Sequence, residues 1–478
     1  MVEEKLLIGG ARVPAVSGQW SELTDPATGE VWATVAAGGV KDIDRAVQAA
    51  ERARVGWRKL NSRDRTHVLL RLSTLIREHR ESLAQLESRN VGKPIREARD
   101  EVDLAADCFE YYAGAINKVG GQTIPVGAAG TCLTFREPIG VCGLIAPWNF
   151  PIAITSWKVA PALAMGNTIV LKPATQTPLT ALRLGELALE AGVPAGVLNV
   201  VPGPGSVAGD ALIRHPLVRK VSFTGSTEIG AQVMQLAAED IKNVTLELGG
   251  KSANLVFADA DLEKAVPKAM WSVLGNAGQD CCARSRLLLE RPLYEEFLYR
   301  LSNEFKNLKL GLPLQEDTEI GPLVSQSHRD RVYQYIELGK QEGATLVYGG
   351  TIPTQENLKN GAFLQPTIFA DVHPEMRIAQ EEIFGPVIAA IPFDTEEEAV
   401  AIANNSFYGL SGSIWTHDIS RALRVARSME TGVISINTGH SVHLEAPFGG
   451  VKRSGIGREL GLAVLDNYSE WKSVFIAE

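Results

Sequence analysis

The strongest constraint on the fold is an alternation of apolar strands and amphipathic helices between residues 139 and 248. The strand-like runs are almost continuously apolar, which is typical of a parallel sheet that helices cover on both faces. Strands are expected at residues 141–146, 168–171, 197–201, 220–223 and 244–248, with helices near 155–165, 179–190, 207–213 and 227–238. Ligands of such sheets bind beyond the carboxyl ends of the strands. Those positions hold Trp148, Asn149, Lys172 and residues 203–205 and 225–226.

A second series of strands predicts another α/β domain after residue 249. Its strands are expected at residues 253–257, 287–289, 345–348, 387–393, 413–415 and 433–437. Residues 1–36 are expected to form an extended arm of short strands, with a turn at residues 25–30. Helices are expected at residues 43–57, where Asp42 provides the cap, at 63–86 and at 95–116. Residues 120–135 favour a hairpin, and residues 468–476 favour a strand that pairs either with this hairpin or with another chain.

The composition argues against several functional classes. The net charge of −9 includes no basic block, which disfavours nucleic-acid binding. The five cysteines form no CxxC pair, so no zinc site is predicted, and their odd number favours a reducing compartment. Residues 1–10 lack the features of a signal peptide. The apolar stretch 139–157 contains Pro147, Asn149 and Pro151, so it does not predict a membrane span. We expect a soluble cytoplasmic protein.

A cysteine in a glycine-containing turn is the first chemical candidate. Cys281 lies in the stretch 276–282, after an amphipathic run at residues 261–274 and before the apolar strand 287–289. A thiol at a turn beside a helix end is accessible to a small substrate, but most free cysteines are packing residues. Cys281 alone therefore leaves both interpretations open.

Three polar residues near the first sheet also allow two interpretations. Glu247 lies between apolar neighbours, and is either an ordinary polar-face residue or a general base whose pKa is raised by partial burial. Asn149 is either a turn residue or an amide donor to an oxyanion. Lys172 is either solvated or a donor to a ribose or phosphate. The strand, glycine turn and helix start at residues 223–230 could hold a diphosphate on backbone N–H groups, although the pattern is not GxGxxG.

Taken together, these residues resemble the aldehyde dehydrogenase superfamily over essentially the whole chain. Seven motifs match in the family's order, at residues 147–151 (Pro-Trp-Asn-Phe-Pro), 172–174 (Lys-Pro-Ala), 223–230, 246–251, 278–281 (Gly-Gln-Asp-Cys), 381–386 and 447–450. The resemblance implies that the Cys281 thiolate attacks the aldehyde carbon, with the oxyanion between the Asn149 side chain and the Cys281 N–H. Hydride transfer to a nicotinamide then gives a thioester, and Glu247 activates the water that hydrolyses it.

Three other functions are compatible with parts of this pattern. A CoA-acylating relative would resolve the thioester with CoA, but Glu247 argues against it, since that chemistry needs no water-activating base. A thiol hydrolase would use Cys281 and Glu247 without a nicotinamide cofactor. A binding or structural protein would carry an idle site, which the presence of Cys281, Glu247 and Asn149 together disfavours.

The resemblance also implies a site for NAD+ or NADP+. It assigns to the cofactor the residues Ile145, Ala146, Trp148, Lys172, Thr175, Gly205, Gly225, Ser226, Leu248, Glu382 and Phe384. Thr175 departs from a common NAD-preferring pattern, in which a Glu at this position binds the ribose 2′-hydroxyl and repels a 2′-phosphate. We therefore expect NADP+ to be accepted as well, with Lys172 attracting the 2′-phosphate.

A substrate tunnel is implied by position in the family pattern. Its residues are Ile154, Trp157, Asp280, Cys282, His440, His443, Leu444 and Phe448. Most are apolar or aromatic, which suits a medium aliphatic or aromatic aldehyde. Asp280 favours either an amino-aldehyde or a structural hydrogen bond, and Cys282 is either a bystander or the partner of Cys281 in a vicinal disulfide. His440 and His443 have a metal-like spacing, but no other ligand is evident, so no metal is predicted.

The resemblance implies an α/β fold class with three parts. These are a Rossmann-like cofactor domain (residues 1–118 and 139–248), a second α/β catalytic domain (249–450) and a small β bridging or oligomerisation element (119–138 and 451–478). The inserted hairpin exposes strand edges that need a partner. A homodimer or homotetramer is therefore expected, with a small-molecule aldehyde as substrate and no nucleic-acid or membrane partner.

Overall fold

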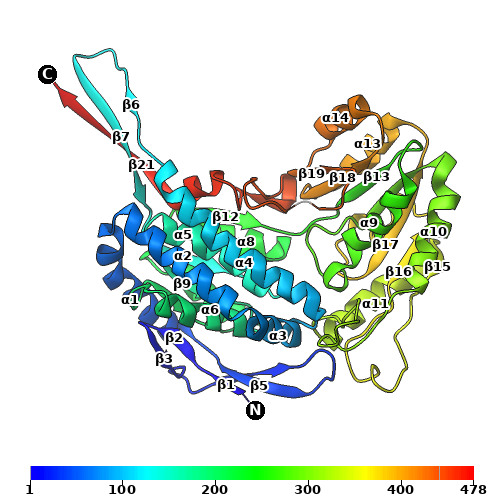
Figure 1. Cartoon of the computed structure of the whole chain (residues 1–478), viewed down its shortest axis with the longest axis horizontal. Coiled ribbons are helices and arrows are strands. Elements are labelled where there is room, and N and C mark those ends of the chain that lie inside the picture. The colour runs from blue at the N-terminus through cyan, green and yellow to red at the C-terminus, as the bar shows by residue number, and fades with distance from the viewer. Residues whose placement is uncertain (1, 441) are drawn as a thin grey trace.

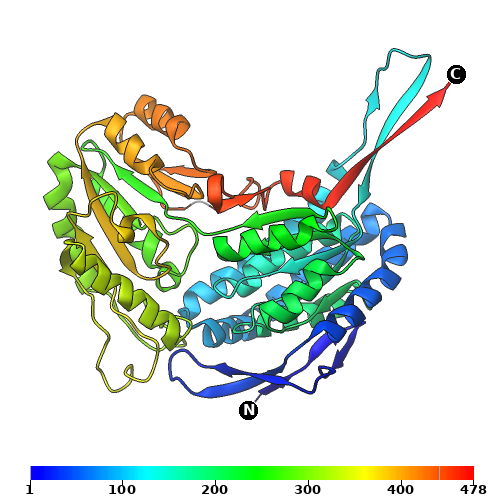
Figure 2. The ribbon, with the colours of Figure 1, turned by 180° about the vertical axis from the view of Figure 1, so that it is seen from behind.

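Two α/β lobes and a projecting β arm make up the molecule (Figures 1 and 2). The structure is a computed structural model that describes residues 2–440 and 442–478. In Figure 1 the first lobe lies at the lower left and the second at the right, while the arm points to the upper left. No helix among the described residues is long and apolar enough to cross a membrane.

An eight-stranded sheet forms the first lobe, in the order β20-β12-β11-β8-β9-β10-β2-β3. Strands β12, β11, β8, β9 and β10 are parallel, whereas β2 pairs antiparallel with β10, and β20 with β12. The bounds are β2 (Leu6–Ile8), β3 (Ala11–Val13), β8 (Val141–Ile145), β9 (Thr168–Lys172), β10 (Leu198–Val200), β11 (Val218–Thr224), β12 (Asn243–Glu247) and β20 (Gly455–Ile456). Strand β20 lies within residues 451–478, which were expected to belong to the bridging or oligomerisation element. In the structure this strand instead extends the sheet of the first lobe, where it pairs with β12.

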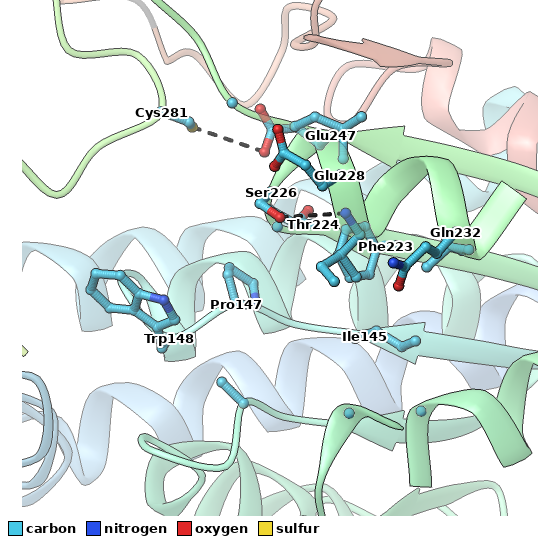
Figure 3. Close-up of a pocket in the computed structure, with 18 of the residues that line it drawn as sticks. Ile145, Pro147, Trp148, Phe223, Thr224, Ser226, Glu228, Gln232, Glu247 and Cys281 are labelled. Carbon is cyan, nitrogen blue, oxygen red and sulfur yellow. Dashed lines mark hydrogen bonds between the residues drawn. The ribbon is translucent and has the colours of Figure 1, made fainter. Parts of the chain in front are cut away.

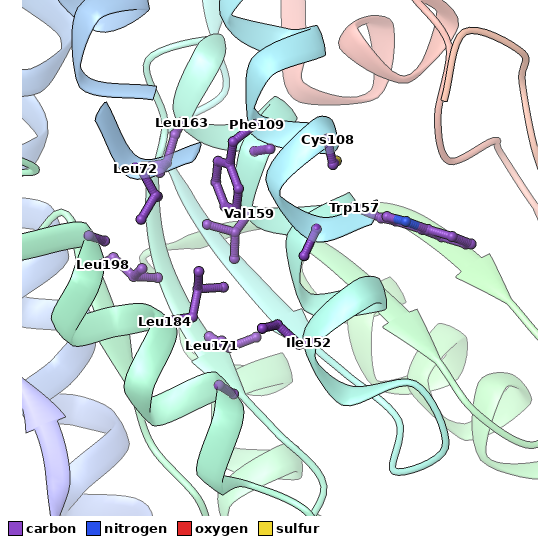
Figure 4. Close-up of a cluster of buried hydrophobic side chains, with 14 of the residues drawn as sticks. Leu72, Cys108, Phe109, Ile152, Trp157, Val159, Leu163, Leu171, Leu184 and Leu198 are labelled. Atoms are coloured by element: carbon purple, nitrogen blue, oxygen red, sulfur yellow. The ribbon is translucent and has the colours of Figure 1, made fainter. Parts of the chain in front are cut away.

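Helices cover both faces of this sheet, as the sequence predicts. On one face α5 and α6 pack on the strands, with α2, α3 and α4 outside them; α1, α7 and α8 cover the other face. Figure 4 shows the first core, where Leu72, Phe109, Val159 and Leu184 from four different helices meet. The bounds are α1 (Val40–Lys59), α2 (Ser62–Glu78), α3 (Arg80–Val91), α4 (Ile95–Ala115), α5 (Pro151–Ala164), α6 (Leu179–Glu190), α7 (Asp210–Arg214) and α8 (Thr227–Ala238).

Two helix predictions near the N-terminus are wrong in detail. The single helix expected at residues 63–86 is interrupted at His79, which ends α2 and precedes α3. The interruption lets both helices bury apolar side chains, such as Leu75 and Leu83, against the same core that contains α4. Helix α1 begins at Val40 rather than at residue 43. The Asp42 carboxylate still closes its first turn, because it accepts the Gly39 N–H at 3.1 Å.

Other predicted boundaries shift for local reasons. Helix α5 begins at Pro151 rather than at residue 155, since proline fits the first turn of a helix, where no N–H partner is needed. The helix expected at 207–213 divides into a π-helical turn (Gly205–Gly209) followed by α7. Strand β16 (Thr367–Ala370) was not predicted at all, because a run of four residues, three of them apolar, shows no periodicity that separates a strand from a loop.

The second lobe contains a seven-stranded sheet in the order β15-β16-β17-β14-β13-β18-β19, with only β15 antiparallel to its neighbour. Its strands are β13 (Ala253–Val256), β14 (Arg286–Glu290), β15 (Thr345–Tyr348), β16, β17 (Val387–Phe393), β18 (Ser411–Trp415) and β19 (Val433–Ile436). Its helices are α9 (Leu262–Leu274), α10 (Tyr294–Lys306), α11 (Gln326–Gln341), α12 (Arg377–Gln380), α13 (Glu396–Asn404) and α14 (Ile419–Ser428). A second α/β lobe is therefore confirmed.

The arm is an antiparallel sheet in the order β21-β7-β6. Strand β7 (Gly130–Pro138) pairs with β6 (Thr123–Ile124) on one side and, along nine residue pairs, with β21 (Ser469–Ala477) on the other. The prediction that the C-terminal strand pairs with the inserted hairpin is confirmed for this chain. A separate small sheet near the N-terminus contains β1 (Val2–Glu4), β5 (Val31–Ala36) and β4 (Trp20–Thr24).

Candidate active site

A cavity of about 710 Å³ opens where the carboxyl ends of β8, β9, β11 and β12 meet the second lobe. Its size is that of a site for a small organic ligand. Residues from both lobes line it, and among them are Ile145, Ala146, Trp148, Asn149, Lys172, Gly205, Gly225, Ser226, Glu247, Leu248, Cys281, Glu382 and Phe384. The structure thus brings together these thirteen residues that the sequence singled out. Thr175 lies beside the cavity, where its hydroxyl donates to the Gly203 carbonyl at 3.0 Å.

An unusual backbone conformation positions the Cys281 turn. After α9 ends, Asn276, Ala277 and Gly278 have φ values of 49°, 55° and 77°, so three consecutive residues are left-handed. This conformation is strained for Asn276 and Ala277. Gly278 is required for a further reason, since a Cβ there would lie 2.2 Å from the carbonyl carbon of Gly385. The turn places Cys281 at the cavity wall, partly exposed.

The Cys281 thiol faces a carboxylate at the end of β12. Its Sγ lies 3.9 Å from Oε2 of Glu247, and Figure 3 shows the two side chains pointing toward each other. Glu247 is only 4% exposed, and its Oε1 is buried without a hydrogen-bond partner. Burial raises the pKa of Glu247 to about 8. The hydrogen bond with Cys282, together with burial, raises the pKa of the Cys281 thiol well above its usual range. Both groups are therefore protonated at neutral pH, and Glu247 is the base nearer to ionisation.

A buried ion pair lies close to Glu247. The Lys158 ammonium, from α5, donates to Glu459 at 2.7 Å and to the Ser222 hydroxyl at 2.9 Å, and both charged side chains are shielded from solvent. Lys158 lowers the pKa of Glu247 and Glu459 raises it, but burial is the larger effect. The sequence did not identify this pair, because its two members are 301 residues apart. The one available signal was a lysine inside the apolar sequence of α5.

The Asn149 side chain is held by one of its two amide hydrogens. Its Nδ2 donates to the Gln279 carbonyl at 2.9 Å, which leaves the second N–H for a ligand. The Asn149 carbonyl accepts the Lys93 ammonium at 2.8 Å and the Asn276 side-chain amide at 2.9 Å. Lys93 is buried and paired with Glu101. Lys93, Glu101 and Asn276 were not predicted, although all three help to fix Asn149 relative to the Cys281 turn.

The opposite end of the cavity contains groups suited to a polar ligand. The Lys172 ammonium donates to the carbonyls of Pro173 (2.8 Å) and Gly203 (3.3 Å), and burial lowers its pKa to about 8. The Ser226 hydroxyl caps α8 by accepting the Ile229 N–H at 3.4 Å, so the N-terminus of α8 opens at the cavity. Glu382 lies instead near the Cys281 turn, because its carboxylate accepts the Gly250 N–H at 3.0 Å and a Cβ on Gly250 would lie 2.4 Å from the Cys281 carbonyl oxygen. Burial raises the pKa of Glu382 to about 7.

The residues expected to form a substrate tunnel lie outside the lining of this cavity, among the residues that the structure describes. Four of them, Ile154, Trp157, Cys282 and Phe448, are buried in the core of the first lobe, and Cys281 and Leu444 pack against that core. The rings of Trp157 and Phe448 are 5.5 Å apart in an edge contact, and those of His440 and His443 are 4.8 Å apart. The Asp280 carboxylate accepts the Cys282 N–H at 2.9 Å.

Comparison with known proteins shows the family of the chain. The betaine aldehyde dehydrogenase of Bacillus subtilis is 45% identical over 478 residues, which cover 99% of this chain and 97% of that protein. A mitochondrial aldehyde dehydrogenase of Leishmania tarentolae is 46% identical, with 100% of this chain and 95% of that protein covered. The structure of an aldehyde dehydrogenase from Bacillus cereus in its NAD+ complex matches with a TM-score of 0.97 and 46% identity, covering 99% of this chain and 96% of that one. The pattern of the aldehyde dehydrogenase family matches residues 13–474, and the chain belongs to this family.

Proposed function

We propose that the protein oxidises an aldehyde to its carboxylic acid with NAD+ as acceptor, through Cys281 as nucleophile and Glu247 as general base. The observation that carries this proposal is the 3.9 Å approach of the Cys281 Sγ to Glu247 at the wall of a cavity large enough for a dinucleotide's reactive end. Family membership supports aldehyde oxidation as the reaction. The NAD+ complex of the Bacillus cereus relative supports NAD+ as the acceptor.

The cavity residues fit a dinucleotide. An unpartnered polar atom supports a polar ligand here, since the buried Thr224 hydroxyl belongs to a lining residue and lacks a partner. Lys172 and Thr175 would bind the adenosine ribose. Gly205, Gly225, Ser226 and the N-terminus of α8 would hold the diphosphate. Glu382, Leu248 and Phe384 would border the nicotinamide and its ribose, and Ile145, Ala146 and Trp148 would line the groove.

NADP+ should also be accepted. Thr175 carries no charge, and its hydroxyl is engaged with the Gly203 carbonyl, so no carboxylate at this position opposes a 2′-phosphate. Lys172 lies beside it and would attract the phosphate. The test is the ratio of kcat/KM for NAD+ to that for NADP+. A preference for NAD+ greater than about a hundredfold, some 2.7 kcal/mol, would refute the proposal.

The proposed reaction has two stages, which are acylation of Cys281 and hydrolysis of the resulting thioester. In its ionised form, Glu247 would accept the proton of the Cys281 thiol, 3.9 Å away, and pass it to solvent. The Cys281 thiolate then attacks the aldehyde carbon, which gives a thiohemiacetal oxyanion. The second N–H of the Asn149 amide and the Cys281 backbone N–H would stabilise this oxyanion. The bound cofactor supplies the acceptor for the aldehyde hydride. Cys281 then carries the acyl group as a thioester.

Glu247 completes the cycle by removing a proton from water. The raised pKa of about 8 makes its carboxylate a stronger base than an ordinary glutamate, provided that it is ionised. The water attacks the thioester, the acid leaves, and the Cys281 thiol is regenerated. The buried Lys158–Glu459 ion pair places one positive and one negative charge near Glu247, the proposed base. We assign this pair no contact with the aldehyde.

The proposed substrate is a medium aliphatic or aromatic aldehyde. Cys281 packs against an apolar core that contains Trp157 and Phe448, and Leu444 packs against the same core, which favours an apolar substituent. The carboxylate of Asp280 is engaged with the Cys282 N–H, which favours a structural role over recognition of an amino group. The name of the Bacillus subtilis relative makes betaine aldehyde the necessary comparison substrate in any panel.

The proposed assembly is a homodimer or a dimer of such dimers, in the cytoplasm. The arm exposes apolar side chains along its strands, including Phe135, Trp471, Phe475 and Ile476, and β6 leaves a free edge. Light scattering coupled to gel filtration tests this proposal, which predicts a mass of at least two chains. A monomer at micromolar concentration would refute it.

The decisive test of function is turnover with NAD+ and NADP+ against aliphatic, aromatic and amino-aldehydes, for wild type and Cys281→Ala. We expect reduced cofactor to form only in the wild type. Turnover by Cys281→Ala at a rate near that of the wild type would contradict the proposed nucleophile.

A further inference from the structure

Three potential metal ligands gather at the Cys281 turn, and a fourth lies beside the Cys281 thiol. A carboxylate oxygen of Asp280 and the Sγ atoms of Cys281 and Cys282 all lie within 4.8 Å of one another. Glu247 adds a fourth donor, because one of its oxygens is 3.9 Å from the Cys281 Sγ and the other is buried without a partner. A carboxylate that has an unpartnered buried oxygen and lies beside one of two adjacent thiols is an arrangement that a cation would satisfy.

The chemistry of these donors selects the kind of cation. Two thiolates and two carboxylates suit Zn²⁺ or Cd²⁺, whereas Mg²⁺ and Ca²⁺ prefer oxygen ligands alone. Two sulfurs bound tetrahedrally at about 2.3 Å from Zn²⁺ stand about 3.8 Å apart. Ligand atoms that already lie within 4.8 Å of one another need to close by about 1 Å, which rotation of the side chains can supply.

We propose that Asp280, Cys281 and Cys282, completed by Glu247, form a binding site for one thiophilic divalent cation, and that its occupation reversibly inhibits the enzyme. Binding forms two metal–sulfur bonds and two metal–oxygen bonds, and it releases the two thiol protons and the Glu247 carboxyl proton to solvent. No electrons are transferred. The bound Cys281 sulfur has committed its lone pair to the metal, so it cannot attack an aldehyde. The effect on turnover rests on the proposed function, but the binding itself does not.

The route to the site is the cavity already described. Cys281 and Glu247 both line it, and Cys281 is partly exposed, so a hydrated ion can reach the Cys281 thiol; Cys282 is buried next to it. Cys282 is the residue that makes this site specific to chains with two adjacent thiols. A single partly exposed thiol would offer a cation one sulfur ligand, whereas this turn offers two.

Binding is tested on the metal-free full chain with zinc chloride, in competition with a zinc indicator. We expect the wild type to bind one Zn²⁺ per chain. Cys282→Ala and Asp280→Asn should each bind Zn²⁺ at least about tenfold more weakly. Removing a residue that only orients a metal ligand already costs about tenfold in affinity, and removing the ligand itself should cost no less. Cys132→Ala, which removes a partly exposed thiol on β7 in the arm, is the matched control and should bind zinc like the wild type. Wild-type zinc affinity in both Cys282→Ala and Asp280→Asn would overturn the proposal.

A spectroscopic measurement on the wild type counts the thiolate ligands directly, so the test does not depend on whether the variants fold. When Cd²⁺ is added to the wild type, the thiolate-to-metal charge-transfer absorbance should correspond to two thiolates per bound ion. In Cys282→Ser the absorbance should correspond to one thiolate per bound ion. A wild-type value of one thiolate per ion would overturn the site as drawn.

Inhibition is measured with each variant normalised to its own rate. Zinc should inhibit the wild type, EDTA should restore the rate, and Mg²⁺ should have no effect. Stoichiometric zinc binding without aldehyde turnover would refute the proposed function and leave this site standing. Aldehyde turnover without zinc binding would refute the metal site and leave the proposed function standing.

Discussion

Replacing Glu247 with Gln should stabilise the fold while it abolishes turnover. In the folded protein, burial raises the pKa of Glu247 from its ordinary 4.5 to about 8. A carboxyl whose pKa is raised by burial costs the folded state nothing below its unfolded pKa, and the cost grows as pH rises from about 4.5 to 8. At pH 7 the proton must be retained at a cost of about 3 kcal/mol, and at pH 5 the cost is about 1 kcal/mol. An amide carries no such cost.

The assay is thermal unfolding of wild type and Glu247→Gln at pH 5 and pH 7. The difference in stability gain between the two pH values is about 2 kcal/mol, which corresponds to roughly 4 °C in Tm for a cooperative unit of ordinary domain size. Glu228→Gln is the matched control, because Glu228 lines the same cavity but is exposed, and its replacement should change stability by no more than about 0.5 kcal/mol. An equal gain at both pH values, or a loss of stability at pH 7, would refute the reasoning.

Three further predictions concern catalysis. Deacylation should accelerate as pH rises through about 8, because only ionised Glu247 accepts a proton from water, and a flat profile of kcat between pH 6 and 9 would contradict this role. Asn149→Ala should lower kcat by about 100- to 1000-fold with little change in the Kd of the dinucleotide, as measured by fluorescence titration; unchanged kcat would exclude Asn149 as the oxyanion donor. Lys93→Met should lower kcat by roughly 10- to 100-fold and destabilise the fold, because it leaves Glu101 buried without its partner. Adding Glu101→Gln to Lys93→Met should recover stability but not kcat, and recovery of both would assign Lys93 a purely structural role.

Much of the fold follows from local sequence pattern. Strands β15 and β17 and helices α6 and α8 have the predicted bounds, because each is a periodic or continuously apolar run between clear turn signals. The break at His79 and the strand β16 depend instead on packing against distant residues, which no local pattern records. The two residues of β20 join the first sheet only because the chain returns to it after the second lobe, 207 residues beyond the end of β12 at Glu247 (248–454).

The candidate site divides in the same way. Residues that follow strands, such as Asn149, Lys172 and Ser226, were predictable because the ends of parallel strands share one edge of a sheet. The buried pairs Lys93–Glu101 and Lys158–Glu459 were not, since a charged residue in an apolar helix indicates that a partner exists without indicating which. The left-handed backbone at Asn276 was equally hidden, because asparagine adopts many turn conformations.

The central claim is that Cys281 carries the acyl group and Glu247 releases it. A single-turnover experiment with Glu247→Gln tests this most directly, with reduced cofactor measured by absorbance and the protein by mass spectrometry. The account predicts a burst of about one reduced cofactor per chain, then no further turnover, with the acyl group attached to Cys281. Continuous turnover by Glu247→Gln at the wild-type rate, or a burst without an adduct on Cys281, would contradict it.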